Sequence, residues 1–413
     1  MDYFVLTSIL VTISALFGYI NVRFVRLPNT IGLTLVTILF TLGIFALSYF
    51  DDTLLRAERF LISQIDFKTV LLDVMLSFLL FAGALHTDLE KLKELRWPIL
   101  LFATFGVLVS TFLVGTAMYF VLDLLGLAVD YIYCLLFGAL ISPTDPIAVL
   151  GILKKAGAPK KLEAKIVGES LFNDGIGVVV FLTIFGLADN SEAGFSFSSV
   201  LELFAVEVLG GVALGLGLGW ITYQLMKRID DYNIEVILTL ATVMAGTVMA
   251  THLHVSGPLA MVVAGLVVGG QKIRHKAMSK QTEDYVDKFW ELIDILLNAI
   301  LFVLIGMEIL VLDLERPFLI AGLIAIPIGL ICRYISLIIP IGLFQKRLDF
   351  VPHTNAIMTW GGLRGAISIA LALGLTEAMH RDLFLVITYC VVIFSILVQG
   401  LTIERLLIRF KLR

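Results

Sequence analysis

Two carboxylates lie in the middle of long apolar segments, where inserting an ionisable side chain into a membrane costs about 2.5–3.5 kcal/mol. Asp145 lies in Ser142-Pro143-Thr144-Asp145-Pro146, and Asp174 follows Glu169-Ser170-Leu171-Phe172-Asn173. Oxygen atoms of carboxylates, hydroxyls and carbonyls are hard ligands that suit an alkali or alkaline-earth cation. Burial makes the charged form of a carboxylate costly, so such a group can hold either a proton or a cation. These residues predict a site that couples the two ions.

The segment from Glu169 to Asp174 places two acids on one predicted helix, together with two neutral polar residues. Ser170 and Asp174 are four residues apart and share a helix face, as do Glu169 and Asn173. Hydrogen bonding between helices would need only the serine and the asparagine. Two acids with no base in the same helix core therefore indicate a further role. The predicted sodium ligands all offer oxygen: Asp174, Asp145, Ser170 and a freed carbonyl near Thr144.

The two prolines around Asp145 predict a break in its helix. Each proline removes a backbone donor and pushes the preceding residue away from the helical conformation. Helical pairing would then leave the carbonyls of Ala139 and Ser142 without partners. Broken backbone at this depth needs surrounding protein or a water-filled cavity. A structural kink is the alternative interpretation, but a kink does not require an acid between the prolines.

A second break is predicted around Arg364, in Trp360-Gly361-Gly362-Leu363-Arg364-Gly365. Three glycines lower helix stability there. The two breaks occupy related places in spans that run in opposite directions, which is typical of an inverted-topology repeat with its site at the crossing. We expect Arg364 to neutralise Glu169. Arg333 is either a second counter-ion or a structural strut.

Other acids in or near the apolar segments are ambiguous between a direct role and pairing or an aqueous crevice. They are Asp73, Glu202, Glu207, Asp294 and Glu308.

The composition restricts the class of protein. Of 413 residues, 59% are hydrophobic and 15% are charged, against roughly 25% charged in a typical soluble domain. The mean hydropathy is +1.00. A soluble fold could not bury this much apolar surface, which excludes an ordinary cytosolic enzyme, a disulfide-built secreted domain and a disordered regulator. The three cysteines lie in apolar stretches without a CxxC pair and are interpreted as core residues.

Runs of about 18 or more apolar residues can cross a hydrocarbon core of about 30 Å. They predict an all-α polytopic membrane protein with thirteen transmembrane helices. The spans cover about 3–20, 31–50, 67–85, 97–122, 131–153, 162–188, 198–226, 234–252, 257–270, 286–312, 317–345, 351–374 and 382–409. We expect one transporter domain, 1–413, with no soluble domain and no cleavable signal peptide.

Basic residues orient the spans. Lys and Arg gather in the loops after odd-numbered spans and in the C-terminal tail. The opposite side holds only Arg56, Arg59, Arg316 and Arg381. Because cytoplasmic loops are enriched in basic residues, the N-terminus is expected outside and the C-terminus in the cytoplasm.

On these motifs the sequence resembles the cation:proton antiporters of the NhaP type, which are related to animal sodium/proton exchangers. The matching stretches are Thr144-Asp145-Pro146, Glu169-Ser170 with Asn173-Asp174, Gly361-Gly362-Leu363-Arg364-Gly365, and Leu79-Leu80-Phe81-Ala82-Gly83 to His86-Thr87-Asp88-Leu89. They follow the family's order over nearly the whole chain.

The resemblance implies the NhaA-like antiporter fold with two broken crossing helices, in a homodimer. Core helices would cover about 97–188 and 317–409, and dimerisation helices about 3–85 and 198–312. It implies that Asp174 carries the ion and the proton, assisted by Asp145, Ser170 and the Thr144 carbonyl. Asn173 would orient the broken span, and Glu169 would pair with Arg364. Because electrogenic relatives have an Asp in place of Asn173, the asparagine implies exchange of one cation for one proton.

The expected protein is therefore a secondary transporter in the cell membrane, not an enzyme. It would exchange Na⁺ or Li⁺ for H⁺ without a cofactor, a metal other than its substrate, or a nucleic acid. A sodium-coupled organic anion symporter and a K⁺/H⁺ antiporter remain alternatives. An intramembrane aspartyl protease would usually show Gly-x-Gly-Asp, and an ATP-driven pump would need GxxxxGK[ST], neither of which the chain has at the expected places.

Overall fold

The computed structural model describes residues 3–51, 53, 55–56, 70, 74–87, 89–94, 96–145, 160–189, 197–309, 312, 314–344 and 352–410. Within these residues every regular element is helical. The helices are α1 (Tyr3–Ile20), η1 (Asn21–Val25), α2 (Asn29–Leu47), α4 (Leu76–Leu85), α5 (Leu89–Glu94), α6 (Arg96–Leu101), η3 (Phe102–Gly106), α7 (Val107–Leu124), α8 (Tyr131–Ile141), α10 (Lys160–Asp189), α11 (Phe197–Met226), α12 (Tyr232–Leu253), α13 (Gly257–Gly269), α14 (Gln271–Ala277), α15 (Lys280–Glu308), α16 (Arg316–Phe344), α17 (Thr354–Gly361), α18 (Ala366–Leu373), η5 (Glu377–Met379), α19 (Arg381–Phe394), η6 (Ser395–Gln399) and α20 (Gly400–Arg409).

The described residues contain nine helices that are long and apolar enough to cross a membrane. The pair α17–α18 forms a tenth candidate, bent by 50° at its break. Three shorter apolar helices, α4, α8 and α13, complete the set. Each of them coincides with a predicted span, so the prediction of an all-helical polytopic protein is confirmed, whereas the number of thirteen crossings stays a prediction.

One boundary differs from the expectation, and one predicted span is described only in part. The predicted span 286–312 begins earlier, because Ser279 caps α15 by accepting a hydrogen bond from Thr282 N at 3.3 Å and the helix starts at Lys280. The predicted span 131–153 is described only through Asp145, and α8 ends at Ile141. Pro146 and the second half of that span lie outside the described residues, as does Asp73.

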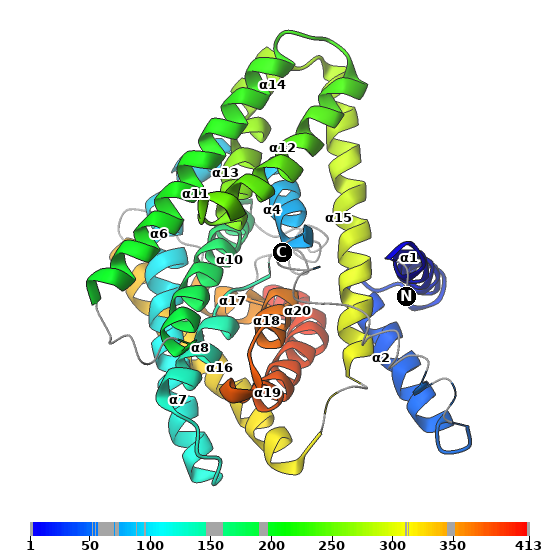
Figure 1. Ribbon diagram of the computed structural model, residues 1–413, viewed down its shortest axis with the longest axis vertical. Helices are drawn as coiled ribbons and strands as arrows, with labels where there is room; N and C mark the ends of the chain where they lie inside the picture. The colour runs from blue at the N-terminus through cyan, green and yellow to red at the C-terminus, as the bar shows by residue number, and fades with distance from the viewer. Residues whose placement is uncertain are drawn as a thin grey trace.

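The helices around the breaks pack into one body with a continuous apolar core. In it α8 packs against α7 and α10, and α18 packs against α8 and α19. Figure 1 shows α8, α10 and α17 to α20 gathered at the centre of the molecule, with α16 running alongside. Phe137 of α8 stacks on Phe384 of α19, with ring centroids 5.5 Å apart. This packing holds the two broken segments beside each other.

A second body lies on the other side of the breaks. Here α11 packs along α13, and α13 packs along α4, which also contacts α15. Trp290 of α15 is fully buried, its ring 4.7 Å from that of Phe81, and its Nε1 donates a hydrogen bond to Thr239 Oγ1 at 2.9 Å. The tryptophan therefore ties α15 to α4 and α12.

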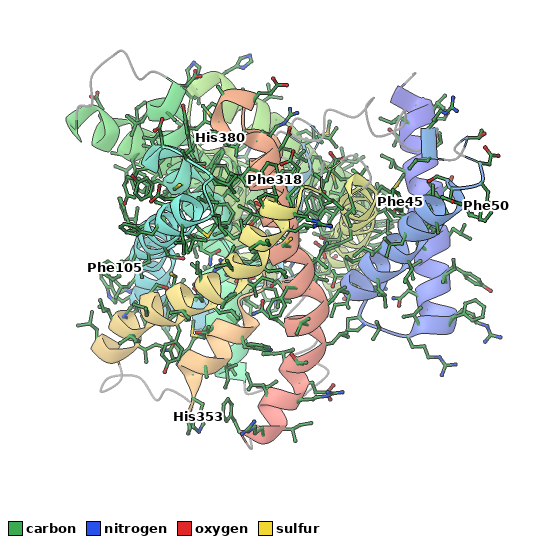
Figure 2. All side chains as sticks on the ribbon, turned by 90° about the horizontal axis from the view of Figure 1, so that it is seen from below. Phe45, Phe50, Phe105, Phe318, His353 and His380 are labelled. Carbon is green, nitrogen blue, oxygen red and sulfur yellow. The ribbon has the colours of Figure 1, made fainter. Side chains whose placement is uncertain are left out.

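Helices α1 and α2 form one edge of the molecule, where their partner in the rest of the bundle is chiefly α15. Figure 2 shows Phe45 and Phe50 at this edge, and both side chains are exposed. In the same view His353, just before α17, and His380, just before α19, lie at opposite sides of the molecule. The broken segment between them therefore spans the bundle from one side to the other.

Candidate functional site

The first break is a non-helical stretch from Ser142 to Asp145 that follows α8. As predicted from the prolines, the helical pattern stops there, and the carbonyl of Ala139 accepts instead from Ser142 N at 3.4 Å. The Asp145 amide donates to Leu363 O at 2.7 Å, which lies in the other broken segment. The two breaks are therefore in direct contact through their backbones.

Glycines make this contact possible. A Cβ on Gly365 would lie 2.8 Å from Cβ of Asp145, closer than side chains pack. A Cβ on Gly177 of α10 would collide with the ring of Pro143. Because neither glycine has a side chain, the first break can lie tightly between α10 and the second break.

Arg364 completes the first break, which is a correction to its expected role. Its Nη1 donates to the carbonyls of Ser142 and Pro143, the latter at 2.8 Å. The Ser142 carbonyl is one of those that the prolines free. A guanidinium offers several donors in a fixed plane, so one side chain can satisfy neighbouring carbonyls. The expected pairing of Arg364 with Glu169 is wrong.

Glu169 pairs with Arg333 instead. Arg333 Nη2 on α16 lies 2.5 Å from Glu169 Oε1 on α10, and both side chains are 2% exposed. This geometry fits the interpretation of Arg333 as a counter-ion better than its interpretation as a structural strut. The two buried arginines therefore have different roles. Arg333 neutralises Glu169, and Arg364 satisfies backbone carbonyls of the first break.

Asn173 and Ser170 hold Thr144 through its backbone and its side chain. Asn173 Oδ1 accepts from Thr144 N at 3.2 Å, and Asn173 Nδ2 donates to Thr144 Oγ1 at 2.8 Å. The Ser170 hydroxyl lies 2.9 Å from the same Oγ1. This network fixes the non-helical segment that carries Asp145 to the helix that carries Asp174.

Asp174 is 3% exposed, and its Oδ1 has no hydrogen-bond partner among the described residues. Asp174 and Asp145 line a cavity together with Pro143 and Gly365. A buried carboxylate that borders a cavity and has an oxygen without a protein donor is available to a proton or a cation.

Three residues of this region were missed from the sequence. Ser395 Oγ accepts from Arg364 N at 2.8 Å and donates to Gln399 Oε1, and Gln399 Nε2 donates to Trp360 O at 2.9 Å. Asn298 of α15 lines the cavity opposite the breaks. In each case the available signal was a polar side chain in an otherwise apolar span, which by itself does not say what the residue contacts.

The fold and the site define a class of protein. Broken helices that meet at a cavity lined by buried acids, inside a bundle of apolar spans, are the architecture of a secondary ion transporter.

Comparison with known proteins identifies the family. Residues 11–409 match the family described as "Sodium/hydrogen exchanger, transmembrane". The chain is 49% identical over 409 residues to the Na(+)/H(+) antiporter NhaP of Pseudomonas aeruginosa, covering 98% of this chain and 96% of that protein. It is 37% identical over 391 residues to the Na(+)/H(+) antiporter NhaH of Halobacillus dabanensis, covering 93% and 92%. The solved structure of the sodium proton antiporter MjNhaP1 from Methanocaldococcus jannaschii is similar in fold, with a TM-score of 0.76 at 18% identity over 99% of both chains.

The chain therefore belongs to the sodium/hydrogen exchanger family and is a multi-pass membrane transport protein. The resemblance found in its motifs is confirmed, and so is sodium/proton antiport as the class of function.

Proposed function

We propose that this chain exchanges one Na⁺ or Li⁺ for one H⁺ by alternating access, with Asp174 as the group that carries either ion. Asp145, Ser170 and the Thr144 carbonyl assist in binding the cation. Asn173 holds the segment from Ser142 to Asp145 in place. Arg364 continues to donate to the carbonyls of Ser142 and Pro143 while access to the site changes from one side of the membrane to the other.

The observation that carries this proposal is the state of Asp174. Its carboxylate is buried, borders a cavity, and has one oxygen without a hydrogen-bond partner among the described residues. A proton or a cation at this oxygen offsets the cost of burying the charge, and the two exclude each other. Asp145 on the same cavity adds negative charge, which favours a cation over an organic anion as the substrate.

The proposed architecture gives the site two sides. Thirteen crossings with inverted repeats would place the N-terminus outside the cell membrane and the C-terminus in the cytoplasm. The core helices at about 97–188 and 317–409 would move against scaffold helices at about 3–85 and 198–312, which also form the homodimer. The two bodies packed on either side of the cavity support this division.

The proposed stoichiometry rests on Asn173. Its amide cannot ionise, and both its oxygen and its nitrogen are engaged with Thr144. One exchanging acid then carries one positive charge in each direction, so the cycle is electroneutral.

Proteoliposomes with an internal pH-sensitive dye test the activity. An outward Na⁺ gradient should move protons inward, Li⁺ should replace Na⁺, and K⁺ should be a poorer substrate. Asp174→Asn should abolish exchange because the neutral amide cannot exchange a proton, whereas Asp189→Asn at the exposed end of the same helix should have no effect. Exchange at the normal rate by Asp174→Asn would refute the assignment.

The same vesicles test the stoichiometry. A K⁺ diffusion potential set with valinomycin should leave the rate of Na⁺/H⁺ exchange unchanged. A rate that follows the membrane potential would contradict one-for-one exchange. Asn173→Asp is the comparison variant, because it adds a second acid beside Asp174.

A further inference from the structure

We propose that the side-chain oxygen of Asn298 on α15 is a further ligand for the cation in the cavity, and that Asp294 positions it. This inference rests on the proposed function, because it assumes that a cation occupies the cavity beside Asp174. It adds a ligand from the wall that faces the broken helices.

The place of Asn298 is the first support. The residue is 6% exposed and lines the cavity together with Pro143, Asp145 and Asp174. Asp145 and Asp174 come from the first break and α10, whereas Asn298 comes from α15. A cation held between these walls would be in reach of oxygen ligands from both.

Hydrogen bonds fix which end of the Asn298 amide faces away from its own helix. Nδ2 donates to the Asp294 carbonyl at 2.9 Å and to Asp294 Oδ1 at 3.0 Å. Both partners are acceptors, so the reverse orientation of the amide would set its oxygen against two other oxygens. The nitrogen is therefore committed to Asp294, and no described residue donates to Oδ1.

An asparagine within a helix commonly bonds the carbonyl four residues earlier, and that bond alone would make Asn298 a structural residue. The second bond, to the Asp294 carboxylate, distinguishes this site, because it orients the amide more firmly. A neutral amide oxygen backed by a carboxylate is a suitable hard ligand for Na⁺.

The proposed movement of the core gives this ligand a specific effect. Asn298 belongs to the scaffold, so the cation would keep Asp174 and lose Asn298 when the core moves. The ligand then changes the affinity on one side of the membrane more than the rate of the moving step. The expected signature is a change in KM for Na⁺ at nearly constant maximal rate.

Asn298→Ala in Na⁺/H⁺ exchanging proteoliposomes tests the ligand. The KM for Na⁺ should rise roughly five- to tenfold, equivalent to about 1 to 1.4 kcal/mol, while the maximal rate stays within about twofold of the unmutated protein. Asn233→Ala makes the same change at an exposed position at the start of α12 and should leave KM unchanged. Thermal unfolding in detergent shows whether each variant is folded.

Two changes at Asp294 test the positioning without removing Asn298. Asp294→Asn keeps an oxygen that can accept from Asn298 Nδ2, so KM should stay near the normal value. Asp294→Leu removes that acceptor and should raise KM as much as Asn298→Ala does. An equal rise in both Asp294 variants would overturn the positioning role, because charge alone would then account for it.

The controls separate this inference from the proposed function. If the unmutated protein exchanges Na⁺ for H⁺, Asp174→Asn is inactive and Asn298→Ala has a normal KM, the ligand is refuted and the proposed function stands. If the unmutated protein does not couple Na⁺ to H⁺, the proposed function itself fails.

Discussion

The two helix breaks meet at one place, but different parts of the molecule complete them. The first, Ser142 to Asp145, is held by side chains from other elements: Arg364, Asn173 and Ser170. The second, Gly362 to Gly365, is held by two residues of the next span. Ser395 accepts a hydrogen bond from Arg364 N, and Gln399 donates one to the carbonyl of Trp360, just before the break.

This difference separates binding from support. The first break brings a carboxylate to the cavity and leaves its own carbonyls to be satisfied from outside. The second break brings a guanidinium that satisfies them. The ion site would then be most sensitive to the groups that hold the first break.

The largest effect is expected at the ion pair that belongs to neither break. Glu169→Ala leaves Arg333 buried without its partner, so the free energy of unfolding should fall by about 3–5 kcal/mol. Thermal and denaturant unfolding of the purified protein in detergent measure this loss.

Double-mutant cycles show which arginine Glu169 serves. Glu169→Ala combined with Arg333→Leu should recover part of the loss, because the unpaired charge is removed. Glu169→Ala combined with Arg364→Leu should show a weaker coupling than the Arg333 pair, because no ion pair joins Glu169 to Arg364 among the described residues. A stronger coupling to Arg364 than to Arg333 would show that the second break, and not α16, supplies the counter-ion.

A smaller loss is expected when Arg364 is changed to lysine. Lysine keeps the charge, but its ammonium nitrogen lies one bond closer to the backbone than Nη1, which donates to both carbonyls, so it cannot satisfy the Ser142 and Pro143 carbonyls in the same way. Losing one hydrogen bond to a charged group should cost about 1.5–3 kcal/mol of unfolding free energy. Na⁺-driven exchange should slow as well, because the first break is less well fixed.

Arg316→Lys is the matched control for that change. Arg316 begins α16 and is exposed, so neither stability nor transport should respond. If Arg364→Lys left both quantities unchanged, the first break would not depend on a donor from the second.

The sequence predicted the elements of this site better than their partners. Helix breaks follow from local rules, because a proline lacks a donor and glycine weakens a helix. The end of α8 before Pro143 and the break between α17 and α18 both lie where these rules place them. The stripe from Glu169 to Asp174 follows from helical periodicity. The partner of Glu169 was wrong because two arginines, Arg333 and Arg364, lie far away in the sequence and both are buried.

What decides between the arginines is the packing of α16 and the second break on α10, which no local pattern contains. Asn298, Ser395 and Gln399 were missed for the same reason. A polar side chain in an apolar span is visible in the sequence, but its hydrogen-bond partners depend on the rotation and depth of the neighbouring helices. The sequence leaves the role of Asp294 open, since its hydrogen bond to Asn298 gains a functional meaning only from the cavity.

The smallest effect is expected at the support of the second break. Ser395→Ala removes an acceptor for Arg364 N and a donor to Gln399, but Arg364 keeps its guanidinium on the first break. The loss of unfolding free energy should be about 1 kcal/mol, and the KM for Na⁺ should not change, because no carboxylate on the cavity is moved. Ser48→Ala, after the end of α2 and far from the breaks in the chain, controls for the loss of a serine hydroxyl. If Ser395→Ala slowed exchange as much as Arg364→Lys, the second break would be as much a part of the ion site as the first, and the asymmetry between them would not hold.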